Sequence, residues 1–472
     1  MTDAPRFTVT EVQLYERDMR LRVPFRFGVI TMTEAPQGFA RVRIRLEDGR
    51  EAWGMAGEVL APKWFDKNPS LSNDDNYDQL RAALAIARRL YTDAGPTTAF
   101  GHYRTCYREQ ITEAASCELN PLVACFGLAV LDKAILDALC RVHDVSFFDA
   151  MANNMAGIEN SDLTPDLDGF NVEQLVRRLR PATHIDARHT VGMLDPIATG
   201  GGDVNDGLPE TLAEAVDAYA HRYFKLKVGG DLDADVARLT EIAGVLDRAD
   251  EPYWATLDGN EQYRDVAGVA ALLDAIRTEP NLARLGESIM FVEQPIERGL
   301  TLDTDITALD AQMPMIIDEA DGTLDAFPKA RTLGYRGVSS KSCKGLYKSI
   351  INAARCRHWN DEAGDERFFM SAEDLTTQAG LGVQQDLALV SLIGCSHVER
   401  NGHHYVNGMA DLPKDEQQAF LDAHSDLYHR ADGAVRLTIQ DGKIALGSLA
   451  CPGFASAAEP DWSAMRPMPH QN

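Results

Sequence analysis

From His184 onward, short apolar runs alternate with amphipathic segments of helical length, and no other feature of the chain constrains its fold as strongly. The runs, in order, are HTVGML, YFKLKV, YWATLD, IMFVEQP, PMIIDEA, GVSSK, FFMSAED and GCSHVE. Segments such as TLAEAVDAYAHR and DADVARLTEIAGVLDR separate them. Eight strands that alternate with helices are typical of a closed parallel barrel. The sequence therefore predicts a (β/α) barrel as the catalytic domain, over residues 184–405.

The first 150 residues have a different pattern. RVRIRLEDGREAWG alternates apolar and polar residues, breaks at Asp48–Gly49 and resumes, which is typical of a β-hairpin. Helical patterns follow, the clearest in PLVACFGLAVLDKAILDALCRVH. We therefore expect an α+β domain over residues 1–150. Residues 430–472 contain a further strand pattern with a turn at Asp441–Gly442, and we expect this segment to return to the N-terminal domain.

The charge balance restricts the partners of the protein. The chain has 72 acidic and 46 basic residues, a formal charge of −26, which would repel a phosphate backbone or an anionic membrane. We therefore expect no nucleic-acid and no membrane partner. A small anionic substrate remains compatible with this charge if a metal ion reverses the local field. The eight cysteines show no C-x-x-C spacing and the chain starts without an apolar signal core, so we expect a cytoplasmic protein. We also expect a homo-oligomer.

Three acids fall at the ends of three successive runs, namely Asp258, Glu293 and Asp318. The carboxyl ends of barrel strands converge on one mouth, so these acids should become neighbours. Close together and buried, they would repel one another. A hard divalent cation such as Mg²⁺ removes the conflict and leaves positions for water or substrate. Each acid alone is better explained as a helix N-cap or a solvated loop residue, but their shared register favours one metal site.

Lysines occur at two further strand ends. Lys225 and Lys227 are two residues apart in a strand and therefore point to the same side. A neighbouring ammonium lowers the pKa of a lysine, which would suit it to act as a general base; two strand-edge lysines facing water are the alternative. Lys341 ends a run that we expect across the barrel from these two lysines. It could therefore act on the opposite face of a bound substrate. Lys344 is a competing candidate, but it falls in the turn that follows, so we choose Lys341.

A divalent cation and a lysine base together suit the removal of a proton alpha to a carboxylate. That step is difficult because the resulting enediolate carries extra negative charge. A cation bound to the carboxylate oxygens offsets this charge as it develops. A positioned base contributes a further factor on the order of a hundred to ten thousand in rate.

In their combination and order, KLK, LDGNEQY, FVEQP, IIDEA and SKSCKG resemble the motifs of the enolase superfamily, in its mandelate racemase and muconate lactonizing enzyme branch. The resemblance covers nearly the whole chain, up to the ending ACPGFA. It implies a modified TIM barrel with an α+β capping domain, one Mg²⁺ on the three acids, and Lys227 as a base. Lys225 would tune that base or contact the substrate carboxylate. Asn260 matches the asparagine that follows the first ligand, and Glu373 matches the seventh-strand acid near the enolate oxygen.

Details of the motifs point to a subgroup and also depart from it. A lysine at position 341, with no histidine at the end of FFMSAED, resembles the muconate lactonizing and dipeptide epimerase subgroup. Glu261 stands where the family commonly has glutamine, and SHVERNGHHYV lacks the Asp-x-Asp pattern of dipeptide epimerases. We expect His403 and His404 at the surface, since an adjacent pair cannot easily turn both rings toward one ion.

The family resemblance also implies a lid over the barrel mouth, formed by PFRFGVITMTE at residues 24–34. Specificity should reside in this lid. Within it, Arg26 is a candidate for binding a second anionic group of the substrate. A solvated loop position is the alternative for this arginine.

The leading hypothesis is a magnesium-dependent isomerase of a small-molecule carboxylate, either a racemase or epimerase or a cycloisomerase. Two opposed lysines favour these reactions. One alternative is a lyase, such as a dehydratase of sugar acids or a succinylbenzoate-synthase-like enzyme, in which one lysine takes the proton and hydroxide leaves. A second is a non-catalytic enolase-like binding protein.

Overall fold

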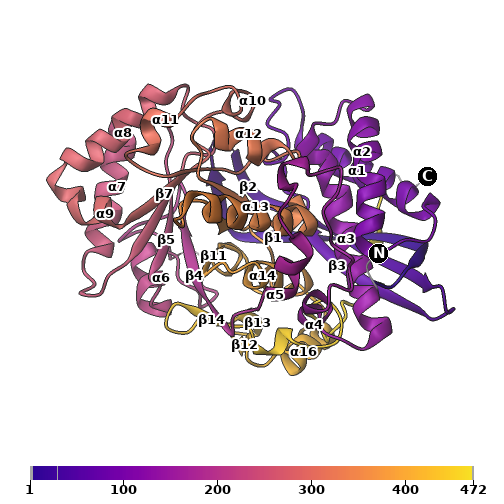
Figure 1. Cartoon of the computed structure of the whole chain (residues 1–472). Coiled ribbons are helices and arrows are strands. Elements are labelled where there is room, and N and C mark those ends of the chain that lie inside the picture. Colours follow the sequence, from indigo (N-terminus) through magenta and orange to yellow (C-terminus); the bar gives the residue numbers. More distant parts are fainter. Residues whose placement is uncertain (1–3, 29, 203, 470–472) are drawn as a thin grey trace.

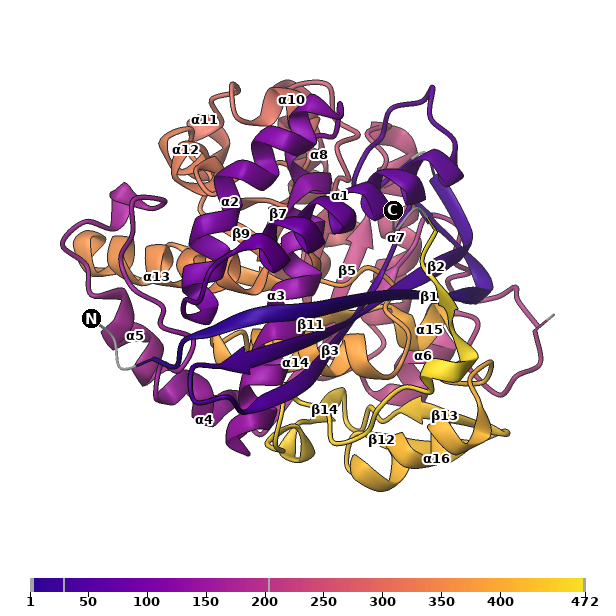
Figure 2. The same cartoon turned by 90° about the vertical axis from the view of Figure 1, so that its right-hand side faces the viewer.

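The computed structural model describes residues 4–28, 30–202 and 204–469 (Figure 1). An antiparallel sheet opens the chain, with strands β1 (Phe7–Phe27), β2 (Ile30–Leu46) and β3 (Glu51–Val59). The strands of this sheet run across the front of Figure 2. Three helices accompany it, α1 (Asn73–Asp93), α2 (Ala99–Ser116) and α3 (Pro121–His143). The hairpin expected at Asp48–Gly49 and the helix expected from Pro121 are both present.

Helix α3 lies at the centre of this first unit because it is apolar on nearly every side. Its start is fixed by Asn120, whose side chain accepts a hydrogen bond from the Val123 backbone N–H. Strand β3 approaches the helix so closely at Gly54 that a Cβ atom there would lie 2.1 Å from the carbonyl oxygen of Ala134. Only glycine fits at this contact.

The barrel expected from the eight apolar runs is confirmed. Within the described residues its strands are β4 (His184–Val191), β5 (Tyr223–Lys227), β6 (Trp254–Asp258), β7 (Ile289–Glu293), β8 (Met315–Ile317), β9 (Gly337–Ser340), β10 (Phe369–Ala372) and β11 (His397–Arg400). Neighbouring strands are parallel, and β11 pairs with β4 to close the ring. The fold is a TIM-like barrel beside an α+β cap.

Further helices precede the barrel, connect its strands and follow its last strand (Figure 1). Those that precede it are α4 (Phe147–Ala152) and α5 (Val172–Arg178). Those that connect its strands are α6 (Leu212–Tyr219), α7 (Leu232–Leu246), α8 (Val266–Thr278), α9 (Ala283–Ser288), α10 (Arg298–Thr301), α11 (Thr307–Asp310), α12 (Ala326–Thr332), α13 (Leu346–Ala363) and α14 (Leu381–Leu392). Those that follow its last strand are α15 (Gly402–Tyr405) and α16 (Lys414–Ala423). None of the helices in the described residues is both long and apolar enough to cross a membrane.

The C-terminal segment contacts both units. Strands β12 (Tyr428–Ala431) and β13 (Ala434–Leu437) form a hairpin. Strand β14 (Lys443–Ala445) adds antiparallel to the beginning of β4, after a turn at Asp441–Gly442 with positive φ at both residues. The last strand, β15 (Arg466–Pro467), pairs with β1 in the cap. The chain thus returns to the cap, but its strand β14 joins the barrel.

The expectation that His403 and His404 lie at the surface is wrong. His404 is 3% exposed, and His403 is only partly exposed. Both belong to α15, whose first residue, Gly402, packs against the chain at Thr377; a Cβ on Gly402 would lie 2.1 Å from the Thr377 carbonyl oxygen. This close approach draws the short helix into the interior and buries the rings.

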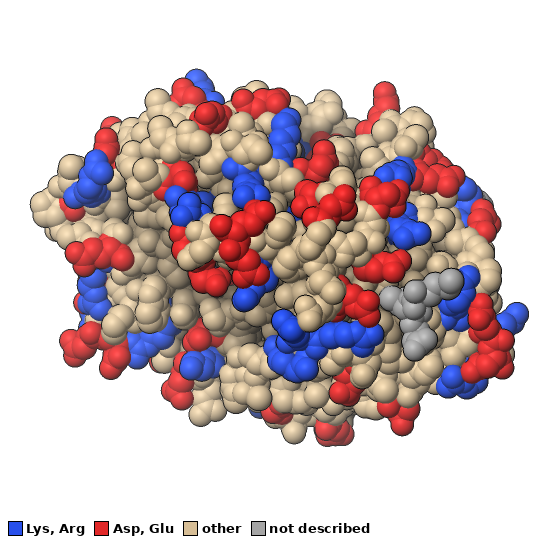
Figure 3. Space-filling model, in the orientation of Figure 1, with Lys and Arg blue, Asp and Glu red and all other residues tan. Residues whose placement is uncertain are grey.

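Acidic and basic side chains lie beside one another on the face drawn in Figure 3. Many of the exposed acids have basic partners, such as Glu47 with Arg6 and Asp162 with Arg108. All eight cysteines are free thiols, six of them buried, while Cys117 is exposed and Cys451 is partly exposed.

Candidate active site

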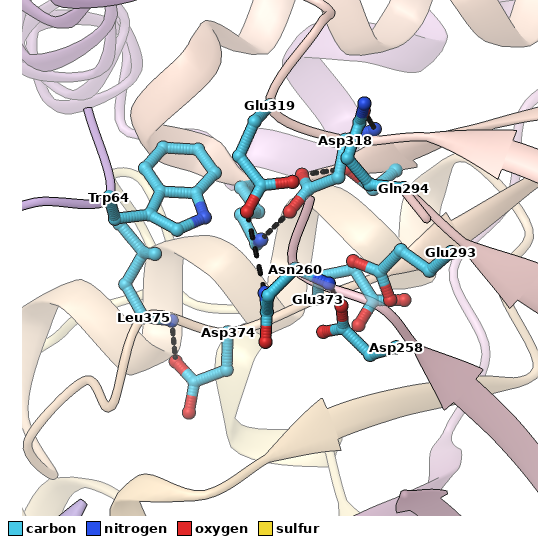
Figure 4. Close-up of polar contacts among 12 residues, drawn as sticks. Trp64, Asp258, Asn260, Glu293, Gln294, Asp318, Glu319, Glu373, Asp374 and Leu375 are labelled. Atoms are coloured by element: carbon cyan, nitrogen blue, oxygen red, sulfur yellow. Dashed lines mark hydrogen bonds and ion pairs between the residues drawn. The ribbon is translucent and has the colours of Figure 1, made fainter. Parts of the chain in front are cut away.

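The three predicted acids lie at the carboxyl ends of neighbouring strands. Asp258 ends β6, Glu293 ends β7 directly opposite it in the sheet register, and Asp318 follows β8. All three side chains are at most 1% exposed. Figure 4 shows Asp258 and Glu293 together, with Asp318 beside Glu319. The barrel therefore gathers at its mouth the side chains that the sequence spread over 60 residues.

Lys225 lies at the centre of these acids. Its ammonium is 2.9 Å from Asp258, 2.7 Å from Glu293 and 2.7 Å from Glu373. A fourth carboxylate, that of Glu399, lies 3.1 Å away. Lys225 therefore supplies positive charge to four buried acids at once.

The electrostatics correct one expectation about this lysine. Burial alone lowers the pKa of Lys225, but the surrounding carboxylates, Asp258 and Glu293 foremost, outweigh burial and raise the pKa well above its ordinary value. The same holds at Lys341, where Asp318 outweighs burial and raises the pKa. The expected lowering of the lysine pKa by a neighbouring ammonium is wrong for Lys225, because carboxylates outnumber ammonium groups around it.

The unfavourable part of the arrangement falls on Glu293. Burial raises the pKa of Glu293 well above its ordinary value, and the charges of Asp258 and Glu373 raise it further. At Asp318, by contrast, Lys341 and Lys344 outweigh burial and hold the pKa well below the usual range. Apart from the ion pair with Lys225, neither carboxylate oxygen of Glu293 has a hydrogen-bond partner. The acid with the least compensated charge is therefore one of the three predicted metal ligands.

Two lysines line a cavity at the barrel mouth from different strands. Lys227, at the end of β5, is 2.6 Å from Asp258, and Lys341, after β9, pairs with Asp318. Each also lies near an aromatic ring of the cap, with Lys227 5.9 Å from the ring centre of Phe25 and Lys341 4.4 Å from that of Trp64. Lys344 contacts Ser339 and Asp318 and is not among the residues that line the cavity.

The cap closes this cavity. Phe25, Phe27 and Met32 of the expected lid line it, with Ala61 and Trp64 from the chain after β3. Val29 of the lid lies outside the described residues. The cavity measures about 20 Å³, roughly the space of one water molecule. A substrate larger than a water molecule therefore needs side chains around the cavity to move.

Arg26 and Asn260 differ in their relation to the cavity. Arg26 is not among the lining residues, because it lies between Phe25 and Phe27 and neighbouring strand residues point to opposite sides. Asn260 lines the cavity. Its backbone N–H donates to Asp258 at 2.9 Å, and its side-chain oxygen is buried without a hydrogen-bond partner. Of these two candidates for substrate binding, only Asn260 offers a free polar atom to the site.

Glu373 follows β10 and lies behind Lys225 rather than at the cavity. It pairs with Lys225 and, on its other oxygen, with Arg188 from β4. Burial tends to raise the pKa of Glu373, but Arg188 and Lys225 outweigh burial and lower it to about 2. Glu373 therefore holds Lys225 in place as a permanent anion.

Several charged residues of the site were not predicted. Glu399, at the end of the eighth run, accepts hydrogen bonds from Thr190 at 2.6 Å and from the Asp374 backbone N–H at 3.0 Å. Glu319 follows the predicted ligand Asp318, and burial together with the charge of Asp318 raises its pKa to about 7. The position of Glu399 at the end of the eighth run could have identified it as a site residue, although the run lacks the Asp-x-Asp pattern.

Glu261 is engaged away from the three acids. Its carboxylate accepts from Arg298 at 2.8 Å and pairs with Lys67 of the cap. Glu261, which stands where the family commonly has glutamine, thus forms an ion pair between the barrel and the cap.

The donor set fits a hard divalent cation. It consists of carboxylate and amide oxygens, which Mg²⁺ prefers, and several of them lack hydrogen-bond partners, namely both Glu293 oxygens and the Asn260 side-chain oxygen. The oxygens of the three acids are not all within 4.8 Å of one another in the described residues. Lys225 lies between Asp258 and Glu293, while lysines also hold Asp318. A bound cation would take over charge that these lysines now balance.

Comparison with known proteins gives the fold and not the reaction. No family model and no curated protein sequence matches the chain. Solved structures do match over nearly the whole length. The 2-chloromuconate cycloisomerase from Rhodococcus opacus is 18% identical with a TM-score of 0.60, covering 97% of this chain and 98% of that chain. The muconate lactonizing enzyme from Mucobacterium smegmatis, complexed with muconolactone, is 19% identical with a TM-score of 0.57 and the same coverage.

A third similar structure is the L-Ala-D/L-Glu epimerase from Bacillus subtilis, described as a substrate-liganded complex. It is 16% identical with a TM-score of 0.55, and the match covers 96% of this chain and 99% of that chain. The chain therefore has the fold of mandelate racemase and muconate lactonizing proteins in the enolase superfamily. The resemblance seen in the sequence is confirmed at the level of the fold.

Proposed function

We propose that the protein is a magnesium-dependent isomerase that removes the proton alpha to a carboxylate of a small molecule and returns it, or lets its removal drive a cycloisomerisation. One observation carries the proposal. Lys227 and Lys341, from strands on different parts of the ring, line the same cavity, and each lies on a different acid of the predicted metal site. Two bases around one position are what inversion at carbon requires.

The chain's own groups divide the work. Asp258, Glu293 and Asp318 would hold the cation, which when bound offsets negative charge that develops on the substrate carboxylate. Lys227 would take the proton on one face, and Lys341 would donate on the other. Lys225 would keep the acids compensated. Asn260 would bind the substrate through its free side-chain oxygen, which can accept a hydrogen bond from a donor group of the substrate.

The cap would exclude water from the reacting atoms. Phe25 and Trp64 lie beside the two lysines, so closure of the lid places both bases in an apolar surrounding. A low dielectric strengthens each electrostatic contact made there. The small volume of the cavity supports a lid that opens for substrate and closes for reaction.

The alternatives differ in products and in lysine use. A lyase that dehydrates sugar acids, or one like succinylbenzoate synthase, needs a single base and releases water, which mass spectrometry detects. The two lysines at one cavity favour isomerisation over such a lyase. A non-catalytic binding protein has no need for either base.

Variants of the two lysines test the proposal. With Mg²⁺ and an exchangeable substrate in deuterated water, Lys341→Ala should abolish exchange from one stereoisomer, a loss on the order of a hundred to ten thousand-fold, and leave exchange from the other. Lys227→Ala should show the opposite preference. Lys329→Ala, an exposed lysine paired with Asp303, is the matched control and should exchange as the wild type does. Equal loss from both stereoisomers in both variants would contradict the two-base assignment.

A further inference from the structure

A cluster of histidines lies on the outer side of the barrel, apart from the mouth. His189 comes from β4, His221 precedes β5, and His403 lies in α15. One ring nitrogen of each is within 4.8 Å of those of the other two. In the described residues, no other group of three histidines, cysteines or acids is so close.

Strand geometry separates this cluster from the active site. Arg188 and Thr190 contact Glu373 and Glu399 inside the barrel. His189, between them, must therefore point outward. The same short strand thus serves the charged interior on one side and the histidines on the other.

The ring nitrogens have the character of metal ligands. His221 is 4% exposed, and its Nδ1 lies 3.1 Å from the carbonyl oxygen of Ala187. That contact assigns the proton to Nδ1 and leaves a lone pair on Nε2, the arrangement that second-shell carbonyls give to zinc ligands. The Nε2 atom of His221 is buried without a hydrogen-bond partner.

A core of ordinary satisfied histidines does not account for the free nitrogen of His221. A buried polar atom without a partner is energetically costly. The Nε2 atom of His221 is such an atom. A bound ion or water is the usual partner for such groups.

The nitrogen spacing matches one ion shared by two rings. His189 Nδ1 lies 3.3 Å from His403 Nε2. Two nitrogens bound at about 2.0–2.1 Å to one tetrahedral ion lie about 3.3 Å apart. The pair is therefore already at ligand spacing, and His221 completes a set of three.

A fourth position is available beside His403. This residue lines a pocket of about 210 Å³ together with Tyr219, Arg400 and Asp432. The pocket has room for water or a small ligand next to the cluster.

We propose that His189, His221 and His403 bind one Zn²⁺ ion, with water from the adjacent pocket as the fourth ligand. Three imidazoles suit zinc and its neighbours in the first transition row, whereas Mg²⁺ prefers oxygen. The proposal is independent of the reaction at the barrel mouth.

The ion would act as a structural clip. It would join β4 to the helix after β11, and these two strands form the closing pair of the barrel. The last residue of α15, Tyr405, packs with its ring centre 4.2 Å from that of Phe25, which lines the active-site cavity. Zinc binding would therefore stiffen both the barrel seam and the support of the lid.

Zinc binding to the full chain tests the site. The protein is stripped with a chelator, saturated with Mg²⁺ to fill the oxygen site, titrated with Zn²⁺ and analysed by mass spectrometry for bound metal. We expect one tightly bound zinc per chain. His221→Gln should weaken binding at least tenfold, whereas His184→Gln, an exposed histidine at the start of β4, should bind as the wild type does.

Two further measurements keep the test decisive if His221→Gln does not fold. His403→Gln changes a partly exposed residue and should also lose zinc. Cobalt in place of zinc should give the intense visible absorption of a four-coordinate site with nitrogen donors, and this absorption should persist in Asp318→Asn. Failure of the wild type to bind zinc beside Mg²⁺, or loss of the cobalt spectrum in Asp318→Asn alone, would overturn the proposal.

Discussion

The two faces of strand β4 compensate buried polar groups in opposite ways. On the inner face, Arg188 and Thr190 join a network in which charges meet opposite charges, with Lys225 at its centre. On the outer face, His189 meets other neutral rings, and the Nε2 atom of His221 remains without a partner. The inner face thus carries cations of its own beside its oxygen donors, whereas the three clustered histidines of the outer face offer nitrogen donors. The two proposed sites would therefore select different metals.

Removal of the central cation should have the largest effect. Lys225→Met would leave four buried carboxylates without their shared partner, and breaking a buried ion pair costs about 3–5 kcal/mol. Urea unfolding should show this loss without Mg²⁺ and a smaller loss with it, because the cation then compensates the acids. Lys329→Met is the control. An equally stable Lys225→Met protein without Mg²⁺ would contradict the role given to this lysine.

Zinc should stabilise the outer face by a smaller amount. At a free concentration one hundred times the dissociation constant, a ligand that binds only the folded chain adds about 2.7 kcal/mol. Thermal unfolding should therefore shift upward with Zn²⁺ in the wild type and not in His221→Gln. If Zn²⁺ shifts both proteins equally, the stabilisation arises elsewhere.

A change on the inner face of β4 should leave the outer site intact. Thr190→Val removes the hydroxyl that donates to Glu399 at 2.6 Å, and we expect a loss of about 1.5 kcal/mol in the free energy of unfolding. Because residue 190 points away from the histidines, zinc affinity should not change. A parallel loss of zinc would show that the two faces are coupled.

His424 differs from the clustered histidines because it is a buried histidine with partners on both ring nitrogens. Its Nδ1 lies 3.1 Å from Ser448, and its Nε2 accepts from the Ala457 backbone N–H. Burial lowers the pKa of His424 to about 4. The unfolded chain takes up this proton near pH 6.5 and the folded chain only near pH 4, so the stability is complete above about 6.5 and is lost as pH falls toward 4.

The acid sensitivity of His424→Gln measures this contribution. By about pH 5.5 the wild type should have lost about 1 kcal/mol more than the variant, relative to neutral pH. Urea unfolding over this pH range gives the difference. Parallel pH profiles for the two proteins would contradict a depressed pKa in the folded chain.

The sequence predicted those parts of the molecule that depend on local pattern. The eight strands could be located because each is a short buried run, and Lys341 could be preferred to Lys344 because it ends its run. The high pKa of Lys225 could not be foreseen, since two of its four acidic partners, Glu373 and Glu399, come from the last strands of the barrel and approach β5 only because β11 pairs with β4. Likewise, His189, His221 and His403 become neighbours only through the closure of the barrel.

The orientation of single side chains was also beyond the sequence. Arg26 was a candidate because of its charge, but the alternation within β1 turns Phe25 and Phe27, and not Arg26, toward the cavity. A strand in the lid was not assigned from the sequence, so its register was unknown.

Solvent exchange tests the central claim most directly. The wild-type protein with Mg²⁺ is incubated in deuterated water with a panel of acyl amino acids, sugar acids and lactone precursors, and the products are analysed by mass spectrometry. We predict that deuterium enters the alpha position of at least one carboxylate, without loss of water, and that removal of Mg²⁺ stops the exchange. Loss of water from a sugar acid, or exchange that continues without a divalent cation, would contradict the proposed isomerase.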